Sequence, residues 1–143
     1  MSIQAPPQKV FAVLCDVERW PEWTPTVLSV RQLSGSPFAV GSRYEMRQPK
    51  LRTAIWQVTD LEQQRIFNWE ASAAGLRMKA GHSVDPDGTG SRVELSFEMS
   101  GFLAPLISRL YGSLIENYVC TESQKLKSRC ESAAGHAADL GNK

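Results

Sequence analysis

The sequence has little of what most metal and redox sites require. Its 143 residues include two histidines, His82 and His136, and three cysteines, Cys15, Cys120 and Cys130. No CxxC pair occurs, and no spacing of histidine and cysteine suits a zinc site. On one helix Cys120 and Cys130 would be roughly 15 Å apart, which is too far for a disulfide. We therefore expect reduced thiols, no metal and no cofactor.

Long apolar runs and an excess of one charge are also missing. No stretch approaches the roughly 20 apolar residues that cross a bilayer, and the opening MSIQAPPQKV has no apolar signal core. Sixteen basic residues balance fifteen acidic ones, whereas a nucleic-acid-binding domain normally carries a basic stripe. These absences predict a cytoplasmic domain with no nucleic-acid partner and no stable membrane insertion. Whether it is a monomer or a homodimer stays open.

Two periodicities of apolar residues divide the chain. After Pro6-Pro7 the spacing predicts a short helix over residues 8–15, and a second helical turn is expected over 19–23. A stub of a strand fits in residues 1–4. Alternating apolar and polar residues then predict six strands, at 26–33, 41–48, 52–59, 65–72, 76–84 and 91–100. Short loops between them, including Asp87-Gly88-Thr89-Gly90, indicate an antiparallel meander with one apolar face.

A long amphipathic helix is expected to cover that apolar face. Apolar residues recur at helical spacing from Phe102 to about Glu131, with Pro105 in the first turn or at a kink. Residues 132–143, SAAGHAADLGNK, lack this pattern and are expected to form a flexible tail. The chain would thus consist of one domain, residues 1–131, followed by the tail.

This order of elements resembles the SRPBCC superfamily, which includes START-like, pollen-allergen-like and polyketide cyclase/dehydrase-type proteins. The stretches that carry the resemblance are IQAPPQKVFAVLCDVERWPEWTP at 3–25, VGSR at 40–43, WQVTD at 56–60, FNWEAS at 67–72, GTGSRVELSFEMSG at 88–101 and Leu126-Lys127. The resemblance implies an α+β helix-grip fold. In this fold a curved antiparallel sheet of six to seven strands wraps around the long C-terminal helix, with two short helices after the first strand. Only four residues precede Ala5, so either the first strand is short or the native chain starts upstream.

The resemblance also implies an internal cavity that holds a small apolar ligand. Eight residues point inward by strand parity or helical spacing and are the candidate ligand-binding set: Tyr44, Met46, Trp56, Trp69, Met78, His82, Phe97 and Tyr118. Aromatic and methionine side chains line apolar pockets well. They are equally suitable for an ordinary core, and periodicity does not separate the two interpretations.

Three residues are candidates for acid–base chemistry: His82, Tyr118 and Glu122. His82 would orient a ligand or move a proton, but a structural histidine held by a hydrogen bond is the favoured interpretation, because no second catalytic group is fixed by spacing. Glu122 either faces the cavity with a raised pKa or, more simply, lies at the solvated edge of the helix. A Cys15–His82 dyad is a minor alternative. Trp20 and Trp23 are expected to seal the short helices against the sheet.

Three functions follow from these features. The favoured one is binding of a small hydrophobic or amphipathic molecule, lipid-like or polyketide-like, in the cavity. The alternative is a metal-free enzyme of the polyketide cyclase/dehydratase type, which would need at least two convergent ionisable groups. A weaker alternative is a protein-interaction domain with a filled cavity. The sequence does not identify the ligand or establish that any catalysis occurs.

Overall fold

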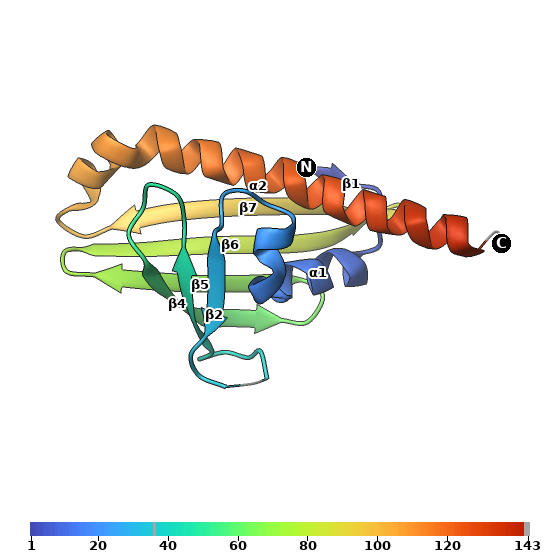
Figure 1. Cartoon of the computed structure of the whole chain (residues 1–143), viewed down its shortest axis with the longest axis horizontal. Helices are drawn as coiled ribbons and strands as arrows, with labels where there is room; N and C mark the ends of the chain where they lie inside the picture. Colours follow the sequence, from blue (N-terminus) through green and yellow to red (C-terminus); the bar gives the residue numbers. More distant parts are fainter. Residues whose placement is uncertain (36, 142–143) are drawn as a thin grey trace.

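The alternating segments form one curved, seven-stranded antiparallel sheet in the computed structural model, which describes residues 1–35 and 37–141 (Figure 1). In spatial order its strands are β1 (Ser2–Ile3), β7 (Gly90–Ser100), β6 (Leu76–Asp87), β5 (Ile66–Ala73), β4 (Ala54–Glu62), β3 (Arg43–Arg47) and β2 (Ser29–Gln32). Strands β2 to β7 thus form the predicted meander, and the stub strand β1 pairs with β7 through Ile3 and Ser91. The predicted α+β helix-grip fold is confirmed.

The strand boundaries differ from the expected ones where local hydrogen bonds compete with pairing. Strand β2 begins three residues later than expected, because Thr24 and Thr26 form a local turn in which the Thr26 N–H donates to Thr24 Oγ1 at 3.3 Å. Strand β6 extends three residues further, to Asp87, which pairs with Gly90 across the predicted tight turn.

Two short helices fill the space between β1 and β2. The first, α1 (Pro7–Cys15), starts with a proline as predicted. The second, η1 (Val17–Glu22), is a 3₁₀ helix that starts two residues before the expected turn. The indole N–H of Trp20 donates to the Leu14 carbonyl at 3.1 Å and ties η1 to α1.

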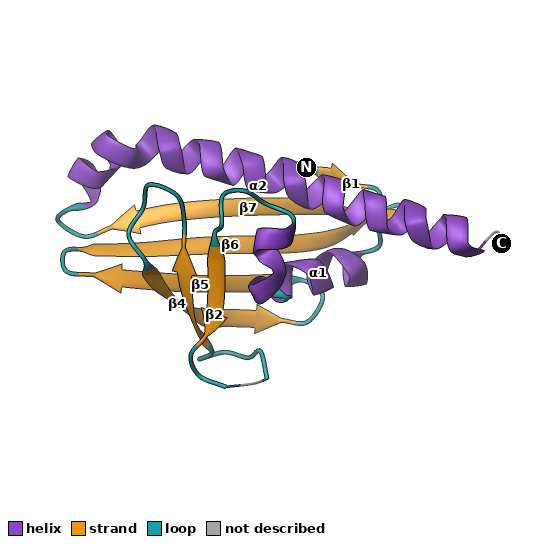
Figure 2. Ribbon diagram, viewed as in Figure 1, coloured by secondary structure: helices purple, strands orange, loops and turns teal. Residues whose placement is uncertain are grey.

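The long helix α2 (Ala104–Gly141) lies along β7 and extends past the edge of the sheet (Figure 2). It is longer than the expected 102–131, because the backbone of residues 132–141 is helical as well. Four of these ten residues are alanines, which have the highest helix propensity. The flexibility expected of the tail stays a prediction, and residues 142–143 lie outside the described residues.

The start of α2 is fixed by close contact between two turns. Gly101, just before the helix, has a φ of +105°, and a Cβ placed there would lie 2.4 Å from the Gly75 carbonyl oxygen. That same carbonyl accepts a hydrogen bond from the Leu103 N–H at 2.9 Å. Only glycine permits this backbone approach. The β5–β6 turn therefore determines where α2 leaves the sheet.

Candidate functional site

The inner face of the sheet divides into a packed aromatic half and a more open half. In the packed half, under α1 and η1, Trp69 has ring centroids 5.4 Å from Trp20, 5.4 Å from Trp56 and 4.9 Å from Phe67. Of the predicted ligand-binding set, Tyr44, Met46, Trp56, Trp69 and His82 are buried in this half. Their contacts with one another are those of a filled core. Trp20 contacts Trp23 and Trp69, as expected for residues that seal the short helices against the sheet.

His82 is held within this core as a neutral side chain. Its ring stacks on Phe67 at 4.6 Å, and its Nδ1–H donates to the Phe67 carbonyl at 2.7 Å. Burial lowers the pKa of His82 to about 4, although the hydrogen bond to Phe67 partly opposes this shift. At neutral pH the ring is uncharged and already satisfies a backbone carbonyl. These contacts match the structural interpretation favoured from the sequence.

The indole N–H of Trp56 is the one buried side-chain polar atom among the described residues that lacks a hydrogen-bond partner. An unpaired buried donor costs roughly 1–3 kcal/mol. A carbonyl or hydroxyl group of a ligand would satisfy it, so Trp56 stays a candidate binding residue. Tyr44 is the cross-strand partner of Trp56 on β3, and it also lines a small pocket of about 190 Å³ with Glu18 and Gln32.

A larger pocket, of about 850 Å³, lies between the end of β7 and the first half of α2. Its lining residues are Phe97, Met99, Ser100, Gly101, Ala104, Pro105, Ser108, Gly112, Ile115, Glu116, Val119 and Cys120. Phe97 is the one member of the predicted set in this lining. Met78 lies beside it on β6, opposite Met99, and is half-buried against the core.

Met99, Ile115 and Val119 also line the pocket and are large and apolar, but they were not in the predicted set. The small lining residues were missed because only large side chains were considered as candidates. Much of the helical wall is made of small ones, Ala104, Ser108 and Gly112, which recur every four residues and so lie on one face of α2. Their size leaves the volume that Phe97 and Met99 border. The four-residue spacing of these small side chains is the sequence feature that could have predicted the pocket wall.

A polar cluster joins α2 to two loops. The Thr26 hydroxyl donates to Glu122 Oε1 at 3.1 Å, and the Tyr118 hydroxyl donates to the Pro49 carbonyl. Burial raises the pKa of Glu122 to about 7, and the Thr26 hydrogen bond partly offsets that rise. Glu122 therefore does not occupy the solvated edge that the sequence favoured. Tyr118 and Glu122 are one turn apart, but neither is among the lining residues of the larger pocket.

The structure gives little support to a Cys15–His82 dyad. Burial raises the pKa of the Cys15 thiol to about 12, which disfavours the thiolate that a dyad would need. All three cysteines are free. Within the described residues, no group of three or more His, Cys, Asp or Glu side chains is placed to hold a metal ion. In the same part of the chain, no helix is long and apolar enough to span a membrane.

Comparison with known proteins identifies the family of this chain. Residues 1–134 match the family described as "Polyketide cyclase / dehydrase and lipid transport". The chain belongs to this family. Membership supports ligand binding or cyclase chemistry in general terms. No curated protein matches the chain in sequence.

Three solved structures with the same fold share little sequence identity with this chain. Ara h 8.0201 shares 13% identity at a TM-score of 0.73, covering 92% of this chain and 94% of its own. The hypothetical protein jhp0584 from Helicobacter pylori shares 14% identity at a TM-score of 0.75. The match covers 90% of this chain and 82% of jhp0584. The di-domain ARO/CYC StfQ from the steffimycin biosynthetic pathway shares 12% identity at a TM-score of 0.74. The match covers 94% of this chain and 50% of StfQ. At such identities the likeness concerns the fold alone.

Proposed function

We propose that the protein binds a small molecule with an apolar body in the pocket between β7 and α2. The observation that carries the proposal is a pair of facing apolar walls, with Phe97 and Met99 on the strand and Ile115 and Val119 on the helix, all half-buried. A ligand that covered them would remove apolar surface from water, at about 25 cal/mol per Å². The volume of about 850 Å³ suits small-molecule sites, which span roughly 300–1,000 Å³.

The rim of the pocket favours an amphipathic ligand. Ser108 and Glu116 belong to the lining and are exposed on α2, so they offer a hydroxyl and a carboxylate where the apolar walls meet solvent. A ligand with a hydroxyl or cationic group at one end would place its apolar body between the walls and its polar end at this rim. Family membership and the separation of this pocket from the packed aromatic core are both consistent with that arrangement.

A variant that fills the pocket tests the proposal. Gly112 lines it, and a Cβ there would meet nothing closer than Ser108 Oγ at 3.6 Å, so Gly112→Leu should fit the helix and occupy ligand space. We expect this variant to be at least as stable as the wild type, since glycine is a poor helix former, but to take up the apolar dye Nile red at least ten-fold more weakly.

The matched control is Ser128→Leu, further along α2 on its exposed surface and away from the exposed Leu106 and Leu110. It adds the same side chain outside the pocket and should leave Nile red uptake unchanged. Equal dye binding by the wild type and by both variants, measured by fluorescence titration, would refute binding in this pocket.

A cyclase or dehydratase activity is the second candidate. Its supporting observation is the Glu122 carboxyl, whose pKa of about 7 suits proton transfer near neutral pH. It ranks second because the three candidate acid–base groups have separate partners: His82 contacts Phe67, Tyr118 contacts Pro49, and Glu122 contacts Thr26. The interaction-domain alternative stays a prediction.

A further inference from the structure

The first turns of α2 carry large apolar side chains on the surface of the molecule. Phe102, just before the helix, is 82% exposed, and Leu106 and Leu110 are 52% and 65% exposed. Leu106 and Leu110 are four residues apart and so lie on one side of α2, and Phe102 precedes them in the turn before the helix. Scattered exposed leucines are normal, but a contiguous row of them on a helix indicates a contact surface. We call these three residues the exposed stripe.

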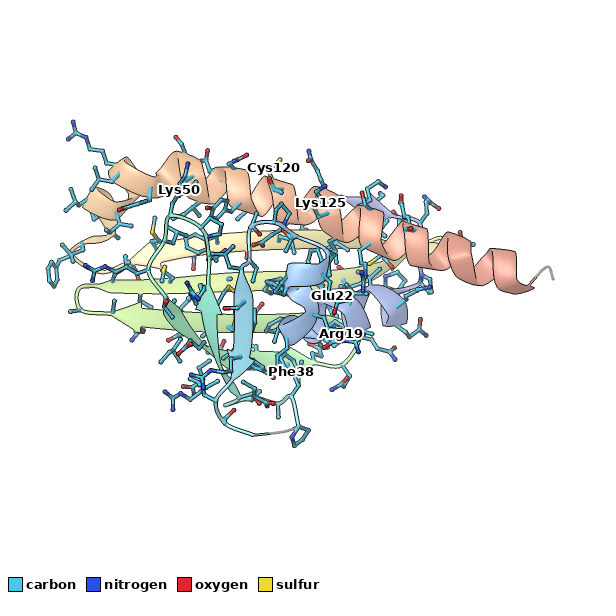
Figure 3. All side chains as sticks on the ribbon, in the orientation of Figure 1. Arg19, Glu22, Phe38, Lys50, Cys120 and Lys125 are labelled. Atoms are coloured by element: carbon cyan, nitrogen blue, oxygen red, sulfur yellow. The ribbon has the colours of Figure 1, made fainter. Side chains whose placement is uncertain are left out.

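The stripe is confined to one half of α2. Between Phe102 and Ile115 the one charged residue is Arg109. Over residues 116–132, the further part of α2 whose side chains the structure describes, no exposed residue is a large apolar one, and the exposed residues include Cys120 and Lys125 (Figure 3). Residues 116–132 of α2 therefore have an ordinary solvated face, whereas the first turns of the helix expose apolar side chains.

The same end of the molecule is basic. Residues 99–115 contain Arg109 and no acidic residue, and residues 46–54, at the β3–β4 loop, contain Arg47, Lys50 and Arg52 and again no acidic residue. The Tyr118–Pro49 hydrogen bond brings this loop against α2, and Lys50 lies beside the helix in Figure 3. The chain as a whole has sixteen basic and fifteen acidic residues, so this end departs from the average.

We propose that this end of the protein docks on an anionic lipid bilayer, with Phe102, Leu106 and Leu110 inserted at the interface. An apolar row next to basic side chains is the combination that holds a helix in the plane of a charged membrane. A second copy of the chain fits less well, because a two-fold contact through this end would bring its basic residues together. Docking of this kind is peripheral and needs no membrane-spanning helix.

Docking would also place the proposed ligand pocket at the membrane. Gly101, Ala104 and Pro105 line the pocket and alternate with the stripe residues along the chain. A bilayer that covered the stripe would border the pocket, so an apolar ligand would pass between membrane and protein without crossing water. This consequence rests on the proposed function, whereas membrane docking itself does not.

Co-sedimentation of the full chain with vesicles tests the proposal. We expect binding to vesicles of phosphatidylcholine with phosphatidylglycerol and much weaker binding to phosphatidylcholine alone. The triple variant Phe102→Ser/Leu106→Ser/Leu110→Ser should bind the anionic vesicles at least roughly ten-fold more weakly. The control Leu33→Ser/Val40→Ser removes exposed apolar side chains from the β2–β3 segment, outside the stripe, and should bind like the wild type.

A variant that removes basic side chains tests the electrostatic part of the proposal without changing the exposed stripe. Lys50→Gln/Arg52→Gln/Arg109→Gln should weaken binding by roughly five-fold for each basic residue that faces the membrane. Arg19→Gln/Arg65→Gln/Arg92→Gln, in other parts of the fold, should not. Circular dichroism of each variant confirms that it is folded.

Three outcomes would overturn the proposal: no binding to anionic vesicles, equal losses in the variants and their controls, or self-association that depends on the stripe in sedimentation velocity. The last would assign the surface to a second copy of the chain. The pocket-filling variant Gly112→Leu should still bind vesicles, because it leaves the stripe intact. Vesicle binding without dye uptake would therefore refute the proposed ligand pocket and not the docking surface.

Discussion

At the scale of single residues, His82 separates a structural role from a chemical one. Its ring is buried against Phe67 and its Nδ1–H satisfies the Phe67 carbonyl. His82→Asn removes the stacked ring and should lower the free energy of unfolding by about 1–3 kcal/mol. Uptake of Nile red per folded molecule should not change, because His82 does not line the pocket. Urea unfolding and dye titration measure the two effects separately. Lost uptake at unchanged stability would show instead that His82 faces the ligand.

At the scale of elements, the contact between the β5–β6 turn and the start of α2 predicts an unusually sensitive glycine. Gly101→Ala places a Cβ 2.4 Å from the Gly75 carbonyl oxygen at a φ of +105°. We expect a loss of at least about 1–3 kcal/mol in the free energy of unfolding from backbone strain, and more from the steric contact. Gly88→Ala is the control, since Gly88 also has a positive φ, +62°, but a Cβ there meets nothing within 4 Å. Similar losses in the two variants, measured by thermal unfolding, would contradict this account of the α2 start.

The same elements show how far the sequence could be used to predict the fold and the site. Strict alternation in residues 91–100 predicted β7 to within a residue, because each strand has one wet and one buried face, and the Asp87–Gly90 turn predicted the hairpin that joins it to β6. The turn at Thr24–Thr26 was missed because it depends on hydroxyl groups meeting in space. The larger pocket was missed for a related reason: parity identifies which side chains point inward, but not which of them touch. Trp56 and Trp69 pack against each other and fill their part of the core, whereas the small residues around Gly112 leave space for the larger pocket.

At the scale of the whole molecule, the near-neutral charge conceals two buried groups whose pKa values move in opposite directions. Burial raises the pKa of Glu122 to about 7 and lowers that of His82 to about 4. Between about pH 4.5 and 6.5 the folded chain therefore holds one more proton at Glu122 than the unfolded chain does, and one fewer at His82. Stability falls with rising pH where the folded state binds more protons, and rises where it binds fewer. The Glu122 contribution is lost as pH rises toward 7, and the His82 contribution is lost as pH falls toward 4, so the two slopes oppose each other.

We therefore expect these two groups to leave the free energy of unfolding of the wild type nearly level between about pH 5 and 6.5, and single variants to reveal each slope. Glu122→Gln should make stability rise with pH over this range, because His82 alone then governs it, by at most about 1.4 kcal/mol per pH unit. His82→Asn should make stability fall with pH by a similar slope. The double variant should be level again, which separates titration from any general loss of packing. Urea unfolding at several pH values measures all four curves. Two single variants that both keep the pH dependence of the wild type would show that neither group titrates with a shifted pKa in the folded chain.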